Sequence, residues 1–153
     1  MQRSAGLLMY RRGAGGVEVL LVHPGGPFFA RKDAGTWSVP KGLAREGEPE
    51  LEAAVREFGE ETSFEVRGER FLDLGEVRQA GGKQVRAWAI EGDCDPARLE
   101  SNTFELEWPP RSGKQQSFPE VDRAGWFDLA VAREKINPAQ GALLDRLQEL
   151  LAK

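Results

Sequence analysis

Short apolar segments alternate with polar, glycine-rich segments along the chain, and the apolar segments have the length of β-strands. Residues 4–11 and 17–23 flank Gly-Ala-Gly-Gly at positions 13–16, a composition that favours a hairpin loop between antiparallel strands. The remaining strands are predicted at 36–39, 70–78, 84–91, 104–108 and 125–127. The pattern therefore predicts a sheet that begins with an antiparallel pair.

Helical spacing of apolar residues predicts three helices. The clearest one covers 49–62, with apolar residues at i, i+3, i+4 and i+7, namely Leu51, Ala54, Val55 and Phe58. A second helix is expected to begin after Asp128, and a third to run from residue 139 to the C-terminal end. Strands mixed with covering helices predict an α+β fold.

The stretch 93–119 carries little periodicity outside the strand predicted at 104–108. Within it, residues 109–116 are polar and contain proline and glycine, which predicts a mobile loop. Long loops of this kind often cover functional sites.

Length and composition narrow the functional classes. The 153 residues are expected to form a single domain, 1–153, that is a monomer or a homodimer. No apolar run is long enough for a membrane span, and the first residues lack the apolar core of a secretory signal, so a cytoplasmic location is expected. A net charge of −4 argues against binding to a nucleic-acid polymer.

Cysteine and histidine chemistry is nearly excluded, because the chain has one residue of each. One cysteine forms no internal disulfide, and one cysteine with one histidine are too few ligands for a structural zinc site. Any catalysis by this protein therefore depends on carboxylates.

Three carboxylates share one face of the helix predicted at 49–62. With Leu51 set at 0° and about 100° per residue, Glu57, Glu60 and Glu61 lie near about 240°, 180° and 280°, away from the apolar stripe. They crowd the last turns, where the helix dipole disfavours negative charge, so the arrangement costs stability unless a cation binds. A solvated acidic face is the alternative interpretation. Carboxylates without histidine or cysteine suit Mg²⁺ or Mn²⁺.

A longer pattern surrounds these carboxylates. It reads Gly42, five residues, Glu48, seven residues, Arg56-Glu57-Phe58, one residue, and Glu60-Glu61. This pattern resembles the Nudix box of the Nudix hydrolases, with Ser63 in place of the usual glycine and Phe64 at the final apolar position. Segment 37–42, Glu120 and segment 124–127 are also similar to the flanking parts of that family.

The resemblance implies an α/β/α sandwich around a mixed sheet, with the box forming a loop and a helix. It also implies a divalent-metal-dependent hydrolase that cleaves the pyrophosphate linkage of a nucleoside diphosphate linked to another moiety. Segment 37–42 resembles hydrolases of dinucleoside polyphosphates and nucleoside triphosphates more than it resembles sugar-nucleotide hydrolases. The partner would be a small nucleotide or polyphosphate, and the cofactor Mg²⁺ or Mn²⁺.

Roles for individual residues follow from the chemistry and the resemblance together. Glu57, Glu60 and Glu61 are the expected metal ligands, and the resemblance adds the backbone carbonyl of Gly42. Arg56 is expected to orient a box glutamate through a salt bridge.

The general base and the role of Glu48 stay open at this stage. Glu57 and Glu120 compete as base, with Glu57 preferred and Glu120 as an extra ligand or base, while Glu120 could also be a plain surface acid. Glu48 is either a capping acid at the helix start or an outer partner of the site.

Phosphate groups on a substrate need cationic partners. Lys41 lies next to the box glycine, and the similar Pro-Lys-Gly of the family implies that it contacts phosphate. Arg111 and Lys114 in the 109–116 loop could move onto a bound polyphosphate. Two rival functions remain at this stage. One is a catalytically inactive Nudix-like domain that binds nucleotides or regulates, and the other is a structural metal-binding module.

Overall fold

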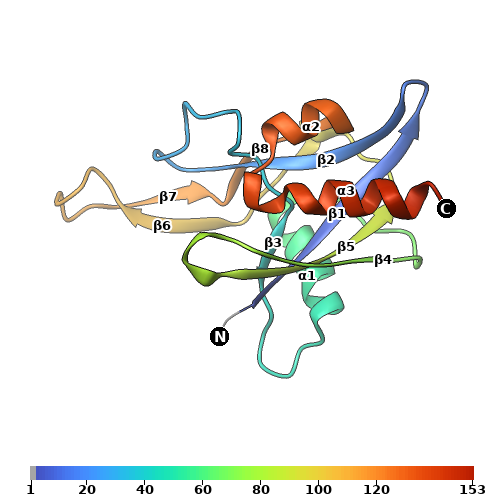
Figure 1. The fold of residues 1–153 in the computed structure, drawn as a ribbon. Helices are drawn as coiled ribbons and strands as arrows, with labels where there is room; N and C mark the ends of the chain where they lie inside the picture. The colour runs from blue at the N-terminus through green and yellow to red at the C-terminus, as the bar shows by residue number, and fades with distance from the viewer. Residues whose placement is uncertain (1–2) are drawn as a thin grey trace.

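The computed structural model describes residues 3–153 and contains a mixed sheet flanked by helices (Figure 1). In spatial order the sheet comprises β4 (Leu72–Arg78), β5 (Gln84–Glu91), β1 (Arg3–Gly13), β2 (Gly16–Pro24) and β8 (Val121–Asp128), and β3 (Lys41–Leu43) pairs with β1. β1 and β5 run parallel, whereas the other neighbouring strands are antiparallel. The predicted hairpin between the first two strands is confirmed.

Helices cover both faces of this sheet, as an α/β/α sandwich requires. α1 (Glu50–Thr62) covers one face, and α2 (Leu129–Lys135) and α3 (Gly141–Leu151) cover the other. Short 3₁₀ turns occupy 80–82, 96–98 and 138–140. None of the helices within residues 3–153 is long and apolar enough to cross a membrane.

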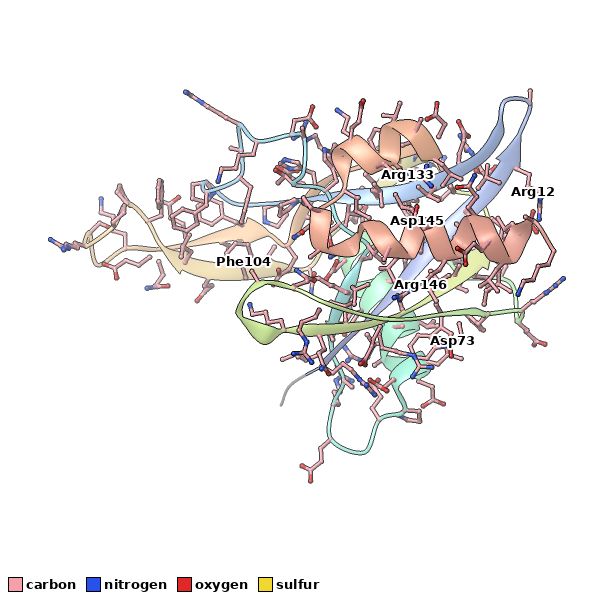
Figure 2. The ribbon with its side chains drawn as sticks, viewed as in Figure 1. Arg12, Asp73, Phe104, Arg133, Asp145 and Arg146 are labelled. Carbon is pink, nitrogen blue, oxygen red and sulfur yellow. The ribbon has the colours of Figure 1, made fainter. Side chains whose placement is uncertain are left out.

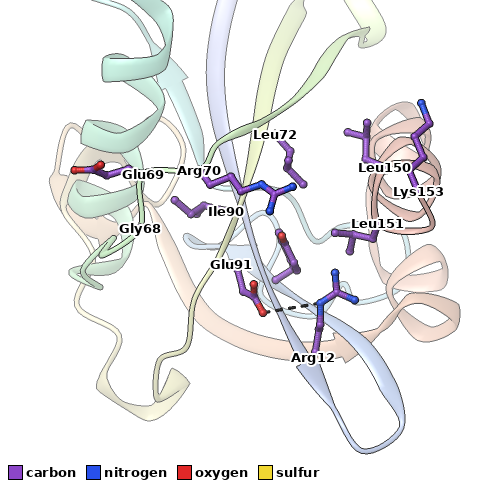
Figure 3. A pocket seen from close by; sticks show the side chains of 11 residues that line it. Arg12, Gly68, Glu69, Arg70, Leu72, Ile90, Glu91, Leu150, Leu151 and Lys153 are labelled. Carbon is purple, nitrogen blue, oxygen red and sulfur yellow. Dashed lines mark ion pairs between the residues drawn. The ribbon is translucent and has the colours of Figure 1, made fainter.

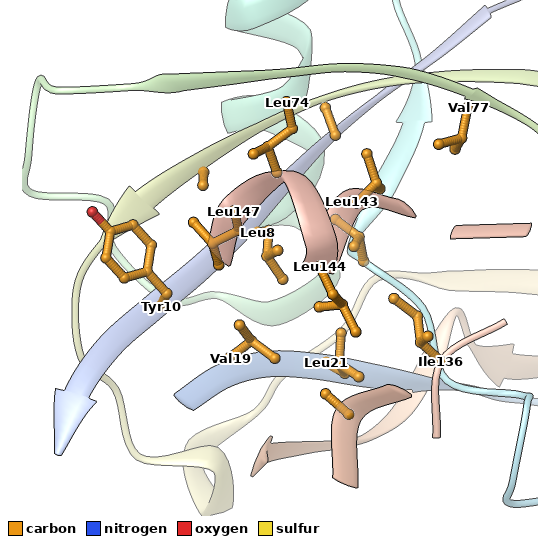
Figure 4. Close-up of a cluster of buried hydrophobic side chains, with 14 of the residues drawn as sticks. Leu8, Tyr10, Val19, Leu21, Leu74, Val77, Ile136, Leu143, Leu144 and Leu147 are labelled. Atoms are coloured by element: carbon orange, nitrogen blue, oxygen red, sulfur yellow. The ribbon is translucent and has the colours of Figure 1, made fainter. Parts of the chain in front are cut away.

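The alternation of side chains along β1 divides the core into two layers. Leu7 and Met9 pack in the cluster beneath α1, whereas Leu8 and Tyr10 pack in the cluster beneath α3 (Figure 4). Successive residues of a strand point to opposite faces, so an apolar run in a central strand serves both layers. This explains why the segment around Leu7 is continuously apolar instead of alternating.

Polar contacts join the two outer helices to each other and α3 to the sheet (Figure 2). Arg133 of α2 forms an ion pair with Asp145 of α3, with 2.9 Å between Nη2 and Oδ1. Nη1 of Arg146 donates to the carbonyls of Leu74 and Glu76 in β4, at 2.9 Å each. These contacts fix the angle of α3 across the sheet.

The strand predicted at 36–39 is wrong. Only isolated bridges occur there, between Ser38 and Val22 and between Trp37 and Ile136. The following residue is Pro40, which has no N–H to continue a ladder. The pairing with β1 starts one residue later, in β3.

The prediction of a mobile loop at 109–116 is also corrected, together with the irregular character assigned to 93–119. Gln115 and Gln116 begin β7 (Gln115–Pro119), which pairs antiparallel with β6 (Thr103–Glu107) in a separate two-stranded sheet. The residues before Gln115 form the turn of this hairpin, which projects away from the rest of the fold (Figure 1).

Candidate active site

The carboxylate face of α1 is set by burial of the opposite face. Ala53, Ala54 and Phe58 are fully buried against β1, so the residues on the other side of the helix face outward toward β3 and the loop before α1. Pro49 precedes the helix, and its carbonyl accepts the N–H of Ala53 at 3.0 Å, which fixes the first turn.

Arg56 is the centre of an ion-pair network on this face. Its Nε and Nη2 atoms bind the two carboxylate oxygens of Glu48 at 2.8 and 2.9 Å. Its Nη1 atom binds Glu57 at 2.9 Å and Glu60 at 3.0 Å, and Nη2 also donates to the carbonyl of Leu43 at 3.1 Å. Arg56 thus holds two of the predicted ligands, as expected for a positioning residue.

Glu48 lies beside Arg56, and not at the cap of α1. Besides its paired contact with Arg56, its carboxylate accepts the backbone N–H of Arg45 at 2.9 Å. These hydrogen bonds lower the pKa of Glu48 to about 2. Of the two interpretations left open by the sequence, the structure therefore supports the outer partner of the site.

Glu57 packs against the main chain of β3 at Gly42. A Cβ atom at Gly42 would lie 2.1 Å from Cδ of Glu57, far inside van der Waals contact. Any other residue at this position would displace the carboxylate. Glycine at this position therefore leaves the space that the carboxylate of Glu57 occupies, and the peptide group of Gly42 and this carboxylate are neighbours.

A cavity of about 180 Å³ brings Glu61 together with Lys41 and Glu120, between β2, β3 and the start of β8. The main chain of Lys41 lies near the carboxylate of Glu61 and favours its ionised form. Burial raises the pKa of Glu61 to about 8; the nearby charge of Lys41 opposes this rise, and Glu57 and Glu120 add to it. The pKa of Glu120 is also raised, by burial and then by Glu57. The cavity therefore has too little positive charge for its carboxylates.

The same residues suit a divalent cation by their chemistry. Glu61 and Glu120 offer carboxylate oxygens, which are the metal ligands that hard cations prefer. A bound cation would also supply the positive charge that is short around Glu61. Within residues 3–153, no group of three acidic, histidine or cysteine side chains is arranged closely enough to hold a metal ion. Glu57 and Glu60 form ion pairs with Arg56 in this structure.

A chain of backbone hydrogen bonds places Glu120 next to α1. The N–H of Asn102 donates to the carbonyl of Glu60, and the N–H of Glu120 donates to the carbonyl of Asn102, each at 2.9 Å. The N–H of Gly25 then donates to the carbonyl of Glu120 at 2.9 Å. The part played by Asn102 is not predictable from the sequence, because a backbone contact leaves no signal in residue type.

A model of the NUDIX domain matches residues 1–147, almost the whole chain. The chain belongs to the Nudix family. Membership confirms the resemblance, the predicted fold class and the enzyme class, a Nudix pyrophosphohydrolase. The family is in general divalent-metal dependent.

Solved structures from several organisms have the same fold. A binary complex of a C. elegans Ap4A hydrolase has a TM-score of 0.67 and 25% identity, with 98% of each chain covered. The Nudix hydrolase RenU from M. smegmatis has a TM-score of 0.62 and 24% identity, covering 98% of this chain and 85% of that one. The NUDIX domain of Shewanella oneidensis NrtR, complexed with ADP ribose, has a TM-score of 0.65 and 18% identity, covering 97% and 86%. The last two likenesses concern the fold alone.

Ser63 occupies the position where the Nudix box usually has glycine, and it adopts the left-handed conformation that a glycine would favour. Its φ is 64°, and its N–H donates to the carbonyl of Gly59 at 2.8 Å to close α1. Its hydroxyl donates to the carbonyl of Glu100 at 2.7 Å, a contact that glycine would lack. The helix exit of this Nudix box is therefore formed by serine.

Arg111 and Lys114 lie apart from the Nudix carboxylates. Both are exposed in the turn of the β6–β7 hairpin, which projects away from the sheet (Figure 1). Neither side chain lines the cavity that contains Lys41, Glu61 and Glu120. Their contact with substrate stays a prediction, and it requires the hairpin to bend or the substrate to extend along it.

Proposed function

We propose that this chain is a Mg²⁺- or Mn²⁺-dependent hydrolase that cleaves the pyrophosphate linkage of a nucleoside diphosphate linked to another moiety. The proposed substrates are dinucleoside polyphosphates first and nucleoside triphosphates second. The observation that carries the proposal is the convergence of Lys41, Glu61 and Glu120 in one cavity beside the carboxylate face of α1. The likeness over 98% of both chains to an Ap4A hydrolase supports the first substrate class.

The cation would be held by Glu57, Glu60 and Glu61, with the backbone carbonyl of Gly42 as a further ligand. When bound, a divalent cation neutralises phosphate charge, polarises the phosphoryl group and acidifies a bound water. Arg56 would keep Glu57 and Glu60 oriented, because it already binds both carboxylates at 2.9 and 3.0 Å.

Lys41 is proposed to bind a phosphate oxygen of the substrate. Its ammonium group acts on both Glu61 and Glu120, so it carries positive charge to the place where the carboxylates gather. Among the described residues that line the cavity, Lys41 is the cationic one, so its ammonium group is the proposed partner of a phosphate there.

Glu120 is proposed as the general base, with Glu57 as the alternative. Two observations support Glu120: it has no ion pair within residues 3–153, and burial raises its pKa toward the range that suits proton transfer at neutral pH. Glu57, by contrast, is bound by Arg56 and pressed against Gly42. Replacement of the base by glutamine should lower kcat with little change in KM.

A hydrolysis screen tests the proposal. Purified protein is incubated with Mg²⁺ or Mn²⁺ and with nucleoside triphosphates, dinucleoside polyphosphates, ADP-ribose and sugar nucleotides, and the products are identified. Glu60→Gln and Glu61→Gln should lower turnover by about 100-fold or more, as expected for lost ligands. Glu52→Gln is the matched control, since Glu52 is exposed on the first turn of the same helix.

Three outcomes would contradict the proposal. Hydrolysis of none of these compounds, with nucleotide binding retained, would instead indicate a domain that only binds nucleotides. If Glu60→Gln and Glu61→Gln both keep activity within a few-fold of wild type, Glu60 and Glu61 are not metal ligands. Equal turnover with and without a divalent cation would contradict the proposed metal dependence.

A further inference from the structure

A second cavity, of about 390 Å³, lies at the opposite end of β1 from the carboxylate site. β1 meets β3 at Ser4–Gly6, whereas this cavity is lined by Tyr10 and Arg12 of the same strand. Six residues of strand separate the two places by about 20 Å. Leu72, Ile90 and the final turn of α3 supply apolar walls. The cavity is therefore a place of its own, with the size of a small-molecule site.

Tyr10 presents a hydroxyl group to this cavity, and no partner for it lies in the described part of the chain. The residue is only 5% exposed, and its ring packs in the cluster beneath α3, with the oxygen directed away from that cluster (Figure 4). Within residues 3–153 the hydroxyl makes no hydrogen bond, but it is not a buried unsatisfied atom, because it borders the cavity. A phenol held by a buried ring and open only on the cavity side is a fixed hydrogen-bond donor for a ligand.

Two guanidinium groups approach the same space. In Figure 3 the side chains of Arg12 and Arg70 extend into the cavity from opposite walls. Arg70 has no carboxylate within 4.0 Å in residues 3–153, and Arg12 reaches only Glu91, at 4.0 Å. Glu69 also borders the cavity, but its carboxylate points away from the two arginines (Figure 3). The two guanidinium groups are thus largely unneutralised.

We infer that this cavity binds a small organic oxyanion, a phosphate monoester or a carboxylate attached to an apolar body. The guanidinium groups of Arg12 and Arg70 match the oxygens of such a group, and the hydroxyl of Tyr10 supplies a further donor. The apolar walls formed by Leu72 and Ile90 accommodate the body of the ligand. The ligand competes with Glu91 for Arg12, and that pair is at the limit of ion-pair distance.

Titration of ¹⁵N-labelled protein with phenyl phosphate, without divalent cations, tests this inference. Saturable shifts are expected at the backbone amides of Arg12, Arg70 and Glu91, and inorganic phosphate should bind several-fold more weakly because it lacks the apolar body. Arg70→Gln should weaken phenyl phosphate about ten-fold, and Tyr10→Phe about five-fold, since each removes one donor. Tyr10→Phe keeps the buried ring, so the fold is preserved.

Arg67→Gln is the matched control, because Arg67 is exposed, pairs with Glu65 and does not line the cavity. Its affinity for phenyl phosphate should equal that of wild type. The inference fails if no saturable shift occurs at these amides, if Arg70→Gln binds as tightly as wild type, or if inorganic phosphate binds equally well. Because the readout is binding at this cavity and not hydrolysis, its result is independent of the proposed function.

Discussion

Replacement of Glu61 by glutamine is expected to stabilise the metal-free protein at about pH 8 and to have little effect at about pH 5. Glu61 is held in a cavity with Glu120, near Glu57, and burial is the main cause of its raised pKa. In the unfolded chain the same carboxyl ionises in water at its ordinary value. Glutamine has the shape of the protonated acid and carries no charge at any pH.

The size of the effect follows from the two pKa values. The pKa of Glu61 is about 8 in the folded protein and 4.5 as the ordinary value. Because the folded state binds this proton more tightly than the unfolded state, stability is present below pH 4.5 and is lost as the pH rises toward 8. Each ten-fold difference in acidity is about 1.4 kcal/mol, so the loss between about pH 5 and about pH 8 is on the order of 3 kcal/mol.

Urea unfolding with a chelator, at both pH values, measures this loss. The free energy of unfolding of wild type, relative to Glu61→Gln, should fall by on the order of 3 kcal/mol between the two pH values. Glu52→Gln should follow wild type, since Glu52 is exposed on the first turn of α1. Parallel pH profiles for wild type and Glu61→Gln would refute the reasoning, because the carboxyl would then be equally acidic in both states.

Four further predictions follow from the site and its surroundings. Arg56→Ala should lower kcat/KM by about 10–100-fold with the order of substrates unchanged, and a new preferred substrate would place Arg56 in contact with it. Gly42→Ala should displace Glu57 and lower kcat about 100-fold, and unchanged kcat would contradict the close packing. Ser63→Ala should cost about 1 kcal/mol in urea unfolding, because the hydroxyl contact is lost while the left-handed backbone stays. Burial raises the pKa of Cys94 to about 11, so iodoacetamide at about pH 8 should modify it far more slowly than free cysteine, and equal rates would show an open thiol.

The sequence pattern predicted those helices and strands whose apolar residues follow a single helical or strand period. α1 was predicted within a residue at its start, because its apolar stripe and Pro49 are local signals. β7 was missed because Gln-Gln-Ser carries no apolar alternation, and its pairing partner β6 supplies the order. The strand predicted at 36–39 failed because β-forming residues there find single bridges and no ladder.

The residues of the candidate site also fall into those that local sequence predicted and those that it did not. The box residues from Gly42 to Glu61 were predictable because their spacing along one helix and one loop is local. The contacts of His23, which stands between the cavity-lining residues Val22 and Pro24, were not predictable. Its ring nitrogens meet Asp122, 99 residues away, at 2.8 Å and the carbonyl of Lys32 at 2.6 Å. The cavity around Tyr10 was hidden for the same reason: its arginines come from different parts of the chain.

The β6–β7 hairpin begins directly after Asn102 and returns directly before Glu120, the two residues joined by a backbone hydrogen bond beside α1. The two ends of the hairpin are thus joined to each other and, through Asn102, to the carbonyl of Glu60 in α1. Its ends stay beside α1, while its side chains pack on the loop after β2, where the ring centroids of Trp108 and Phe28 lie 5.5 Å apart. We therefore expect a shortened turn at 109–114 to change the tip of the hairpin without moving Glu120, whereas a change at Trp108 would also affect the loop after β2.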